Sequence, residues 1–233
     1  FGVVAPSLRF PPKVEDGMKA ARGTVLAEVE GKTHSILTGE RLALNLLQRM
    51  SGIATKTRTF VEALGGRPVR LVDTRKTTPG HRMLEKYAVR IGGGHNHRFG
   101  LYDAVMIKDN HIKAAGGVAQ AIRAARNSIP HTMKIEVETE TMEQVREAAE
   151  AGVDIIMLDN MDLSTMRQAV AEIKSIAPLT IVEASGGVTL QTVCDIADTG
   201  VDVISVGGLT YSFKSLDISL DRKSTRLNSS HLG

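Results

Sequence analysis

The chain has 233 residues, of which 42% are hydrophobic and 24% charged, with a formal net charge of +3. Its length allows one barrel-sized domain beside a smaller one, and it contains no apolar stretch long enough to cross a bilayer. The single cysteine, Cys194, excludes an internal disulfide framework and a thiolate metal cluster. Because the start shows no secretory signal pattern, we expect a cytoplasmic protein without a membrane partner.

The first 64 residues predict the remnant of a small domain and a helix that links it to the rest. The segments "GTVLAEVEG" and "HSILTG" have the composition of strands. The following segment, "TGERLALNLLQRMSGIATKTRTFVEAL", predicts a long helix with Thr38 as its N-cap. Its apolar stripe comprises Leu46, Met50, Ile53, Thr57, Phe60 and Leu64.

Residues 65–220 alternate short Val- and Ile-rich runs with helical patterns. We interpret the runs as parallel strands that are apolar on both faces, because helices would cover the sheet on each side. The six predicted strands lie at 69–74, 104–110, 134–140, 153–160, 179–187 and 201–208. This series predicts a parallel α/β sheet built by right-handed crossovers.

Each predicted strand ends in polar residues or glycines. In a closed α/β barrel the loops after the strands meet at one mouth, whereas an open doubly wound sheet spreads them along an edge. So many polar strand ends favour a barrel, although six strands are found where a complete barrel has eight.

Cationic residues are concentrated between Arg70 and Lys113. This stretch holds nine of the 29 Lys and Arg residues and four of the seven histidines, against four acids. The members expected at strand ends or beside the glycine triplet 92–94 are Arg75, Lys76, His97, Arg98 and Lys108. Grouped cations at a barrel mouth indicate a site for an anion, and guanidinium groups suit carboxylates and phosphates.

Other interpretations of this stretch remain open. The pair His95 and His97 has a spacing that two zinc ligands could use, although the cationic surroundings oppose a dication. Lys108 could form a Schiff base, as in a barrel lyase or aldolase. The glycine triplet lacks the spacing of a dinucleotide or P-loop motif, so we expect a helix C-cap and turn after Ile91.

Two glycine pairs follow the last two predicted strands. They belong to "SGG" (Ser185, Gly186 and Gly187) and "VGG" (Val206, Gly207 and Gly208), and the last loops of α/β barrels often bind phosphate. Opposite these pairs, Glu138 and Asp159 end the third and fourth predicted strands, where they could hold ribose hydroxyls or Mg²⁺ with a pyrophosphate. This combination suits a phosphoribosyl donor and a carboxylated acceptor.

Several motifs together resemble the quinolinate phosphoribosyltransferase family. They are "ERLALN", "SGIAT", "DTRKTTPGHR", "KYAVRIGGGHNHRFGLYDAVMIKDNH", "LDN" and "EASGG". The resemblance covers residues 10 to 220. It implies an incomplete α/β barrel of six or seven strands, a small N-terminal open-faced sandwich, further sequence before Phe1, and a homodimer or higher homo-oligomer with a shared active site.

The resemblance also implies residue roles. Arg41 would cross to the partner's site, and Arg75, Lys76, His97 and Arg98 would bind the carboxylates of quinolinate. Lys76, Lys108, Glu138 and Asp159 would be catalytic, with Glu138 and Asp159 reaching Mg²⁺ indirectly or through the substrate's pyrophosphate. The full substrate-binding set is Arg41, Thr74, Arg75, Lys76, His97, Arg98, Lys108, Glu138, Asp159, Ser185, Gly186, Gly187, Val206, Gly207 and Gly208.

The reaction implied is Mg²⁺-dependent transfer of phosphoribosyl from phosphoribosyl pyrophosphate to quinolinate. It would release pyrophosphate and CO₂ and give nicotinate mononucleotide for NAD synthesis. The alternatives are a related phosphoribosyltransferase-like protein associated with molybdate transport, and an inactive truncated fragment.

The last thirteen residues, "DRKSTRLNSSHLG", have no apolar period. They resemble a translated sequencing adapter, and we expect residues 221–233 to be a non-native tail. The tail holds three basic residues and one acid, so the net charge is +1 without it. With only 3% aromatic residues to stack on bases, the chain is not expected to bind nucleic acid.

Overall fold

The computed structural model describes residues 1–221, so the predicted tail, apart from Asp221, lies outside the described residues. The chain divides into two units, one formed by Phe1–Ser51 with the described residues from Ser215 onward, the other by Gly52–Lys214. Among residues 1–221, none of the helices has the length and apolar character that a membrane span requires.

The first unit contains the beginning of helix α1 (Thr33–Leu64) and a preceding segment made of turns, bends and isolated β-bridges. The predicted strand at 23–31 forms only isolated antiparallel bridges, from Ala27 to Pro12 and from Glu30 to Arg9. The predicted strand at 34–39 is wrong, because this segment is the first part of α1. The predicted N-cap is wrong too: Thr38 lies inside the helix and its hydroxyl donates to the carbonyl of His34 at 2.9 Å. Short apolar runs are compatible with either a strand or a helix, and this one is helical.

The second unit is built on a six-stranded parallel sheet, which confirms the predicted α/β fold and all six predicted strands. The strands are β1 (Arg70–Val72), β2 (Val105–Ile107), β3 (Ile135–Thr139), β4 (Ile155–Asp159), β5 (Ile181–Ser185) and β6 (Val203–Ser205). Their order is β1-β6-β5-β4-β3-β2. Within the described chain no ladder joins β1 to β2, so hydrogen bonding leaves the sheet open between these two edges.

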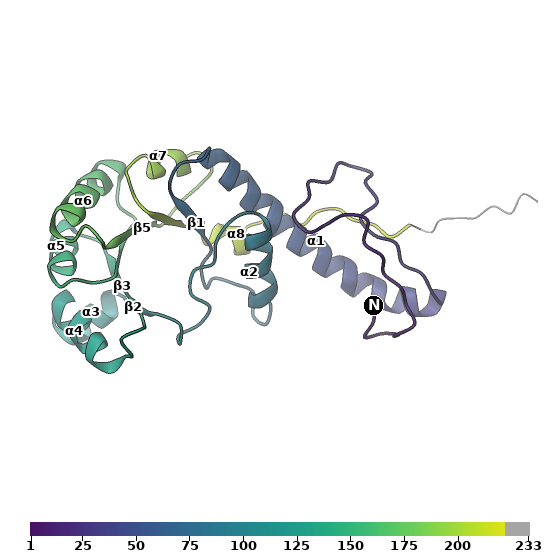
Figure 1. Cartoon of the computed structure of the whole chain (residues 1–233), viewed down its shortest axis with the longest axis horizontal. Helices are drawn as coiled ribbons and strands as arrows, with labels where there is room; N and C mark the ends of the chain where they lie inside the picture. Colours follow the sequence, from purple (N-terminus) through teal and green to yellow (C-terminus); the bar gives the residue numbers. More distant parts are fainter. Residues whose placement is uncertain (222–233) are drawn as a thin grey trace, which may run out of the picture. The chain divides into compact units, whose positions relative to one another are not determined.

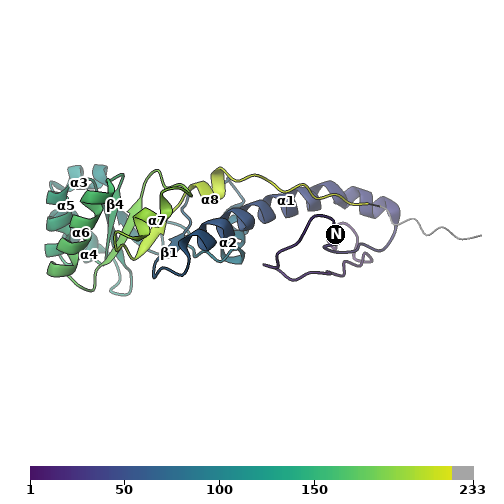
Figure 2. The same ribbon diagram turned by 90° about the horizontal axis from the view of Figure 1, so that it is seen from above.

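Helices follow the strands along the chain. They are α2 (Arg82–Ile91), α3 (Asp109–Ala115), α4 (Val118–Ser128), α5 (Met142–Glu150), α6 (Leu163–Ile176), α7 (Val193–Ala197) and α8 (Gly208–Tyr211). Figure 1 shows α3 to α7 along the outer side of the strands, and in Figure 2 α2 lies beside the C-terminal part of α1.

The expectation of strands that are apolar on both faces is wrong for β3 and β5. In β3, Ile135 and Val137 are buried on the helix-covered side, while Glu136 and Glu138 alternate with them and point to the inner side. In β5, Glu183 takes the inner position between Val182 and Ala184. The sheet therefore encloses carboxylates, which need partners inside the fold.

The segment that follows the glycine triplet extends the sheet beyond β1. His95 forms a parallel bridge with Val72, its N–H donates to the carbonyl of Leu71 at 2.8 Å, and its carbonyl accepts from the N–H of Asp73 at 3.1 Å. Because side chains alternate along extended backbone, Asn96 points outward toward α2 and His97 points inward. This segment takes the place of a seventh strand at the β1 edge.

The glycine triplet ends α2 as predicted. Gly92 is its C-cap, and Gly93 adopts the left-handed conformation with φ of 92°, which glycine tolerates without a steric penalty. A Cβ on Gly92 would lie 2.6 Å from Cβ of Thr57 in α1, and a Cβ on Gly94 would lie 2.8 Å from Cγ2 of the same threonine. Two of the glycines are therefore also required by the close approach of α1.

Candidate active site

A fully buried ion pair lies between β1 and α2. Asp73 follows β1 and Lys86 lies on α2, and neither side chain is exposed to solvent. The two groups form a hydrogen bond, and the Lys86 ammonium also lies 5.0 Å from the ring centre of Phe99. Burial raises the pKa of Asp73 and lowers the pKa of Lys86, while their mutual contact opposes both shifts.

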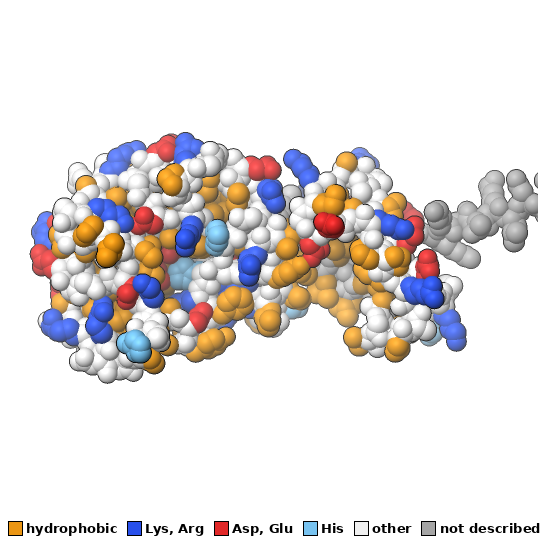
Figure 3. Space-filling view, in the orientation of Figure 1, with side chains coloured by type: hydrophobic (Ala, Val, Ile, Leu, Met, Phe, Trp, Pro, Cys, Tyr) orange, Lys and Arg blue, Asp and Glu red, His pale blue; other side chains and the backbone are white. Residues whose placement is uncertain are grey.

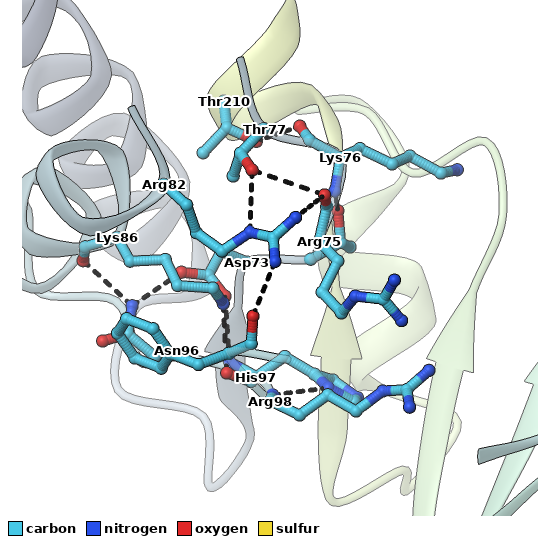
Figure 4. A network of polar contacts seen from close by, with 12 residues as sticks. Asp73, Arg75, Lys76, Thr77, Arg82, Lys86, Asn96, His97, Arg98 and Thr210 are labelled. Carbon is cyan, nitrogen blue, oxygen red and sulfur yellow. Dashed lines mark hydrogen bonds and ion pairs between the residues drawn. The ribbon is translucent and has the colours of Figure 1, made fainter. Parts of the chain in front are cut away.

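This ion pair fixes the backbone around His97 (Figure 4). The N–H of His97 donates to Asp73 Oδ1 at 2.9 Å, and its carbonyl accepts from Lys86 Nζ at 3.0 Å. Asn96 Nδ2 donates to Asp73 Oδ2 at 2.6 Å and to the carbonyl of Lys86 at 2.9 Å. Both sides of the extended segment are thus held, which determines where His97 and Arg98 point.

Arg82, at the start of α2, connects the loop after β1 with the loop after His97. Its Nε donates to Thr77 Oγ1 at 3.0 Å, and its Nη1 donates to the carbonyl of Phe99 at 2.8 Å. The carbonyl of Arg75 is 3.4 Å from Nη2. The guanidinium therefore holds the two loops that carry the predicted acid-binding residues.

Arg75 and Arg98 extend from this network in the same direction (Figure 4). Burial lowers the pKa of Arg98, and the nearby charge of Arg75 lowers it further. In the described part of the chain, the buried Nε atoms of both arginines have no hydrogen-bond partner. Two neighbouring guanidinium groups with free donors are an arrangement that an anion would stabilise.

His97 reaches across the inner side of the sheet to two buried glutamates. Its Nε2 lies 3.2 Å from Glu136 Oε2 and 3.4 Å from Glu183 Oε2, and its Nδ1 accepts the N–H of Arg98 at 2.8 Å. Burial alone would lower the pKa of His97, but hydrogen bonds and charges of the two glutamates outweigh it and raise the pKa to about 10. A ring protonated at both nitrogens gives up the Arg98 bond and keeps the stronger carboxylate contacts.

These three side chains also have the spacing of a metal site. Their ligand atoms lie within 4.8 Å of one another. However, Nε2 already makes contacts with both carboxylates, and the positive charge of Arg98 lies close enough to Glu136 to affect the pKa of the arginine. A proton balances this cluster better than a dication.

The predicted acidic residues lie at the ends of neighbouring strands. Glu138 of β3 forms an ion pair with Lys108, which follows β2. Asp159 of β4 accepts a hydrogen bond from Asn160 Nδ2 at 2.9 Å. Both carboxylates are partly exposed, so they remain accessible to a ligand or a hydrated cation.

A cavity of about 430 Å³ opens between the loops that follow β1, β5 and β6. The predicted substrate-binding residues that line the cavity are Thr74, Lys76, Ser185, Gly186, Gly187, Val206, Gly207 and Gly208. A Cβ on Gly207 would lie 3.1 Å from Lys76 Cδ and 2.8 Å from the Tyr211 ring. Among the residues that line this cavity there is no aspartate or glutamate.

The structure therefore brings the predicted residues of the second unit together in groups. One group lines the cavity, a second comprises Arg75, His97 and Arg98, and a third comprises Lys108, Glu138 and Asp159. Figure 3 shows Lys, Arg and His side chains around a hollow on one face of this unit. Arg41 belongs to the first unit, where it is exposed on α1.

Four residues that shape this region were missed by the sequence interpretation, Lys56, Arg82, Lys86 and Glu136, while Glu183 was counted only among the polar ends of the strands. The alternation in "KIEVETE" could have indicated an inward-facing Glu136. Lys56 and Lys86 lie on helices, and no pattern in the sequence shows which strand ends their side chains reach.

The fold and the site together define the class: an α/β enzyme with a cationic, glycine-rich mouth at the carboxyl ends of its parallel strands. Comparison with known proteins gives the family. Residues 53–221 match the C-terminal domain of quinolinate phosphoribosyl transferase, and residues 2–51 match the N-terminal domain of the same family.

Individual relatives agree with this assignment. A probable carboxylating nicotinate-nucleotide pyrophosphorylase of Bacillus subtilis is 53% identical over 89% of this chain and 71% of its own length. A decarboxylating quinolinate phosphoribosyltransferase of Nicotiana tabacum is 45% identical over 94% of this chain and 67% of its own length. The crystal structure of NadC from Streptococcus pyogenes has a TM-score of 0.89 and 45% identity, covering 95% of this chain and 77% of its own.

The chain belongs to the quinolinate phosphoribosyl transferase family. The predicted family and the predicted enzyme class, a pentosyl-transferring enzyme, are thereby confirmed.

Proposed function

We propose that this protein transfers phosphoribosyl from phosphoribosyl pyrophosphate to quinolinate and decarboxylates the product. One observation carries the proposal: a pair of guanidinium groups with free donors lies in the same mouth as an acid-free, glycine-rich cavity. The first suits a dicarboxylic acid and the second suits a phosphate. The names of the relatives support the same pair of substrates.

Quinolinate would bind through its two carboxylates to Arg75, Arg98 and His97. Guanidinium groups bind carboxylates with two parallel hydrogen bonds, and the raised pKa of His97 keeps its ring charged at neutral pH. Binding would also offset the repulsion between the two arginines, which contributes to the lowered pKa of Arg98.

The phosphate monoester of the donor would occupy the 430 Å³ cavity. Gly186 has a φ of 94° and Gly187 a φ of 58°, so the chain turns sharply after β5 in a conformation that favours glycine. These residues and Gly207 have no side chains of their own, so a phosphate could come close to their backbone N–H groups. Lys76 would add a positive charge, since its side chain extends away from the arginines in Figure 4.

Glu138 and Asp159 would face the ribose and a magnesium ion. The side chains fit the ion, because Mg²⁺ prefers oxygen ligands, retains several waters and is often held through substrate phosphates. Bound Mg²⁺ would neutralise the departing pyrophosphate. Lys108, released from Glu138 by the ligand, would lie beside the same leaving group.

The reaction balances without an oxidant or reductant. The quinolinate nitrogen attacks C1 of the ribose, the bond from C1 to pyrophosphate breaks, and Glu138 and Asp159 stabilise positive charge on the ribose ring. As CO₂ leaves, the electron pair of the bond to the 2-carboxylate stays on ring C2, where the adjacent positively charged nitrogen stabilises it. One proton replaces the lost carboxyl group and gives nicotinate mononucleotide.

We further propose a homodimer or higher homo-oligomer in the cytoplasm, in which Arg41 of one chain completes the site of another. The support is the family resemblance together with the exposure of Arg41 on α1. Crosslinking from a cysteine at position 41 to a neighbouring chain would test this arrangement.

The reaction is tested by CO₂ release from quinolinate labelled in its 2-carboxyl group. Release that requires both phosphoribosyl pyrophosphate and Mg²⁺, with one nicotinate mononucleotide formed per CO₂, supports the proposal. A folded protein that binds quinolinate and releases no CO₂ would contradict it.

A further inference from the structure

Lys56 of α1 provides a second cation in the phosphate cavity. It lies in the part of α1 that belongs to the second unit, and it lines the cavity together with Lys76, Gly207 and Gly208. A Cβ placed on Gly208 would be 3.6 Å from the Lys56 ammonium nitrogen. The ammonium group is therefore close to the glycine loop that follows β6.

The position of this ammonium group is fixed by Ser212. Lys56 Nζ donates to the Ser212 carbonyl at 2.9 Å and to Ser212 Oγ at 2.8 Å. Ser212 Oγ in turn donates to the carbonyl of Gly208 at 3.0 Å. Both partners of Lys56 are neutral, so its charge is oriented without being neutralised.

The surroundings of Lys56 differ from those of Lys86 and Lys108. Lys86 and Lys108 each form an ion pair with a carboxylate, whereas no carboxylate lines the cavity around Lys56. Burial lowers the pKa of Lys56. A bound dianion would reverse this effect, since it stabilises the charged ammonium.

We infer that Lys56, held by Ser212, binds the phosphate monoester of the donor and provides part of the specificity for a phosphorylated sugar. The inference rests on the proposed function, which places the phosphate in this cavity. A phosphate monoester carries close to two negative charges at neutral pH, so the two lysines that line the cavity match its charge. Ammonium groups bind phosphate as compact point charges and need no bidentate geometry.

The test measures ribose 5-phosphate binding by calorimetry and the KM values of both substrates. Lys56→Met removes the charge and keeps most of the side chain, Lys56→Arg keeps the charge, and Arg58→Met removes a charge from the exposed side of the same helix. We expect Lys56→Met to weaken ribose 5-phosphate binding roughly tenfold or more and to raise the KM for phosphoribosyl pyrophosphate similarly. The KM for quinolinate should be unchanged, Lys56→Arg should recover most of the loss, and Arg58→Met should behave as the unmodified protein.

Three outcomes separate this inference from the proposed function. If folded Lys56→Met binds ribose 5-phosphate as tightly as the unmodified protein, the role of Lys56 is overturned even when CO₂ release is normal. If Lys56→Met and Arg58→Met lose the same affinity, the effect is one of net charge and the inference also falls. If ribose 5-phosphate binding depends on Lys56 but the unmodified protein releases no CO₂, Lys56 remains a phosphate-binding residue and the proposed acceptor is wrong.

Discussion

Lys86 and Arg98 are cations in the same part of the second unit, yet their surroundings are opposite. Lys86 is fully buried and has Asp73, the His97 carbonyl and the Phe99 ring as partners. Arg98 contacts the Ala104 carbonyl at 3.4 Å, and its Nε lacks a partner among the described residues. A neutralised cation holds the structure together, whereas a cation with free donors is available to a ligand. Substitution of Lys86 should therefore lower mainly the stability of the fold, and substitution of Arg98 should weaken mainly the binding of the ligand.

The largest effect is expected for Lys86→Met. It leaves Asp73 as a buried charge without its partner, and breaking a buried pair in this way costs about 3 to 5 kcal/mol in the free energy of unfolding. Urea unfolding measures the loss. The double substitution Lys86→Met with Asp73→Asn removes both charges and should recover part of it. A loss below about 1 kcal/mol, as for an exposed pair, would show that the network does not stabilise the fold.

Arg98→Ala should produce the reverse pattern. We expect quinolinate binding to weaken by about 2 to 3 kcal/mol, because a charged bidentate contact is lost. The free energy of unfolding should change little, since the arginine makes few contacts. The measurement is the KM for quinolinate beside a urea titration, with Arg123→Ala on the exposed side of α4 as the control for charge. An unchanged KM would remove Arg98 from the acceptor site.

Gly186→Ala tests whether the mouth also depends on backbone conformation. The residue has a φ of 94°, and a Cβ there would lie 2.2 Å from Asn160 Oδ1. The strain and the clash should destabilise the protein by roughly 1 to 3 kcal/mol and displace Asn160, which contacts Asp159. Gly187→Ala is the matched control, because φ is also positive there and nothing lies within 4 Å of the added Cβ. Equal losses of stability in the two variants would show that the contact with Asn160 is unimportant.

Near neutral pH, the smallest effect is expected from the titration of His97. Because the folded pKa of His97 is raised from 6.5 to about 10, its contribution to stability is complete below pH 6.5 and is lost as the pH rises toward 10. The KM for quinolinate should rise near the upper end of this range, where the ring loses its charge. Glu183→Gln removes one carboxylate that raises this pKa, so the rise in KM should begin at a lower pH. The same profile in both proteins would show that Glu183 has no influence on His97.

The strands and their ends could be predicted because both depend on local patterns. Val- and Ile-rich runs gave all six strands, and the carboxyl ends of parallel strands necessarily meet at one side. Arg75, Lys108 and Ser185 could therefore be assigned to one mouth from the sequence.

The supporting residues could not be predicted in the same way. Lys86 lies on α2 and is thirteen residues from Asp73, and its pairing with that carboxylate depends on how α2 packs against β1. Glu183 was counted among polar strand ends, and its contact with His97 depends on the curvature that brings β5 opposite the His95–Arg98 segment. The strand predicted at 34–39 is wrong because this short run fits a strand as well as a helix.

The most direct test of this account compares quinolinate with nicotinate, which lacks the 2-carboxylate, by calorimetric titration of the unmodified protein. We expect one quinolinate to bind per chain. Nicotinate should bind more weakly by at least about 1.4 kcal/mol, which is tenfold, because it has no second carboxylate to contact the cationic group. Equal affinities for the two acids would contradict the claim that Arg75, His97 and Arg98 form a site for a dicarboxylic acid.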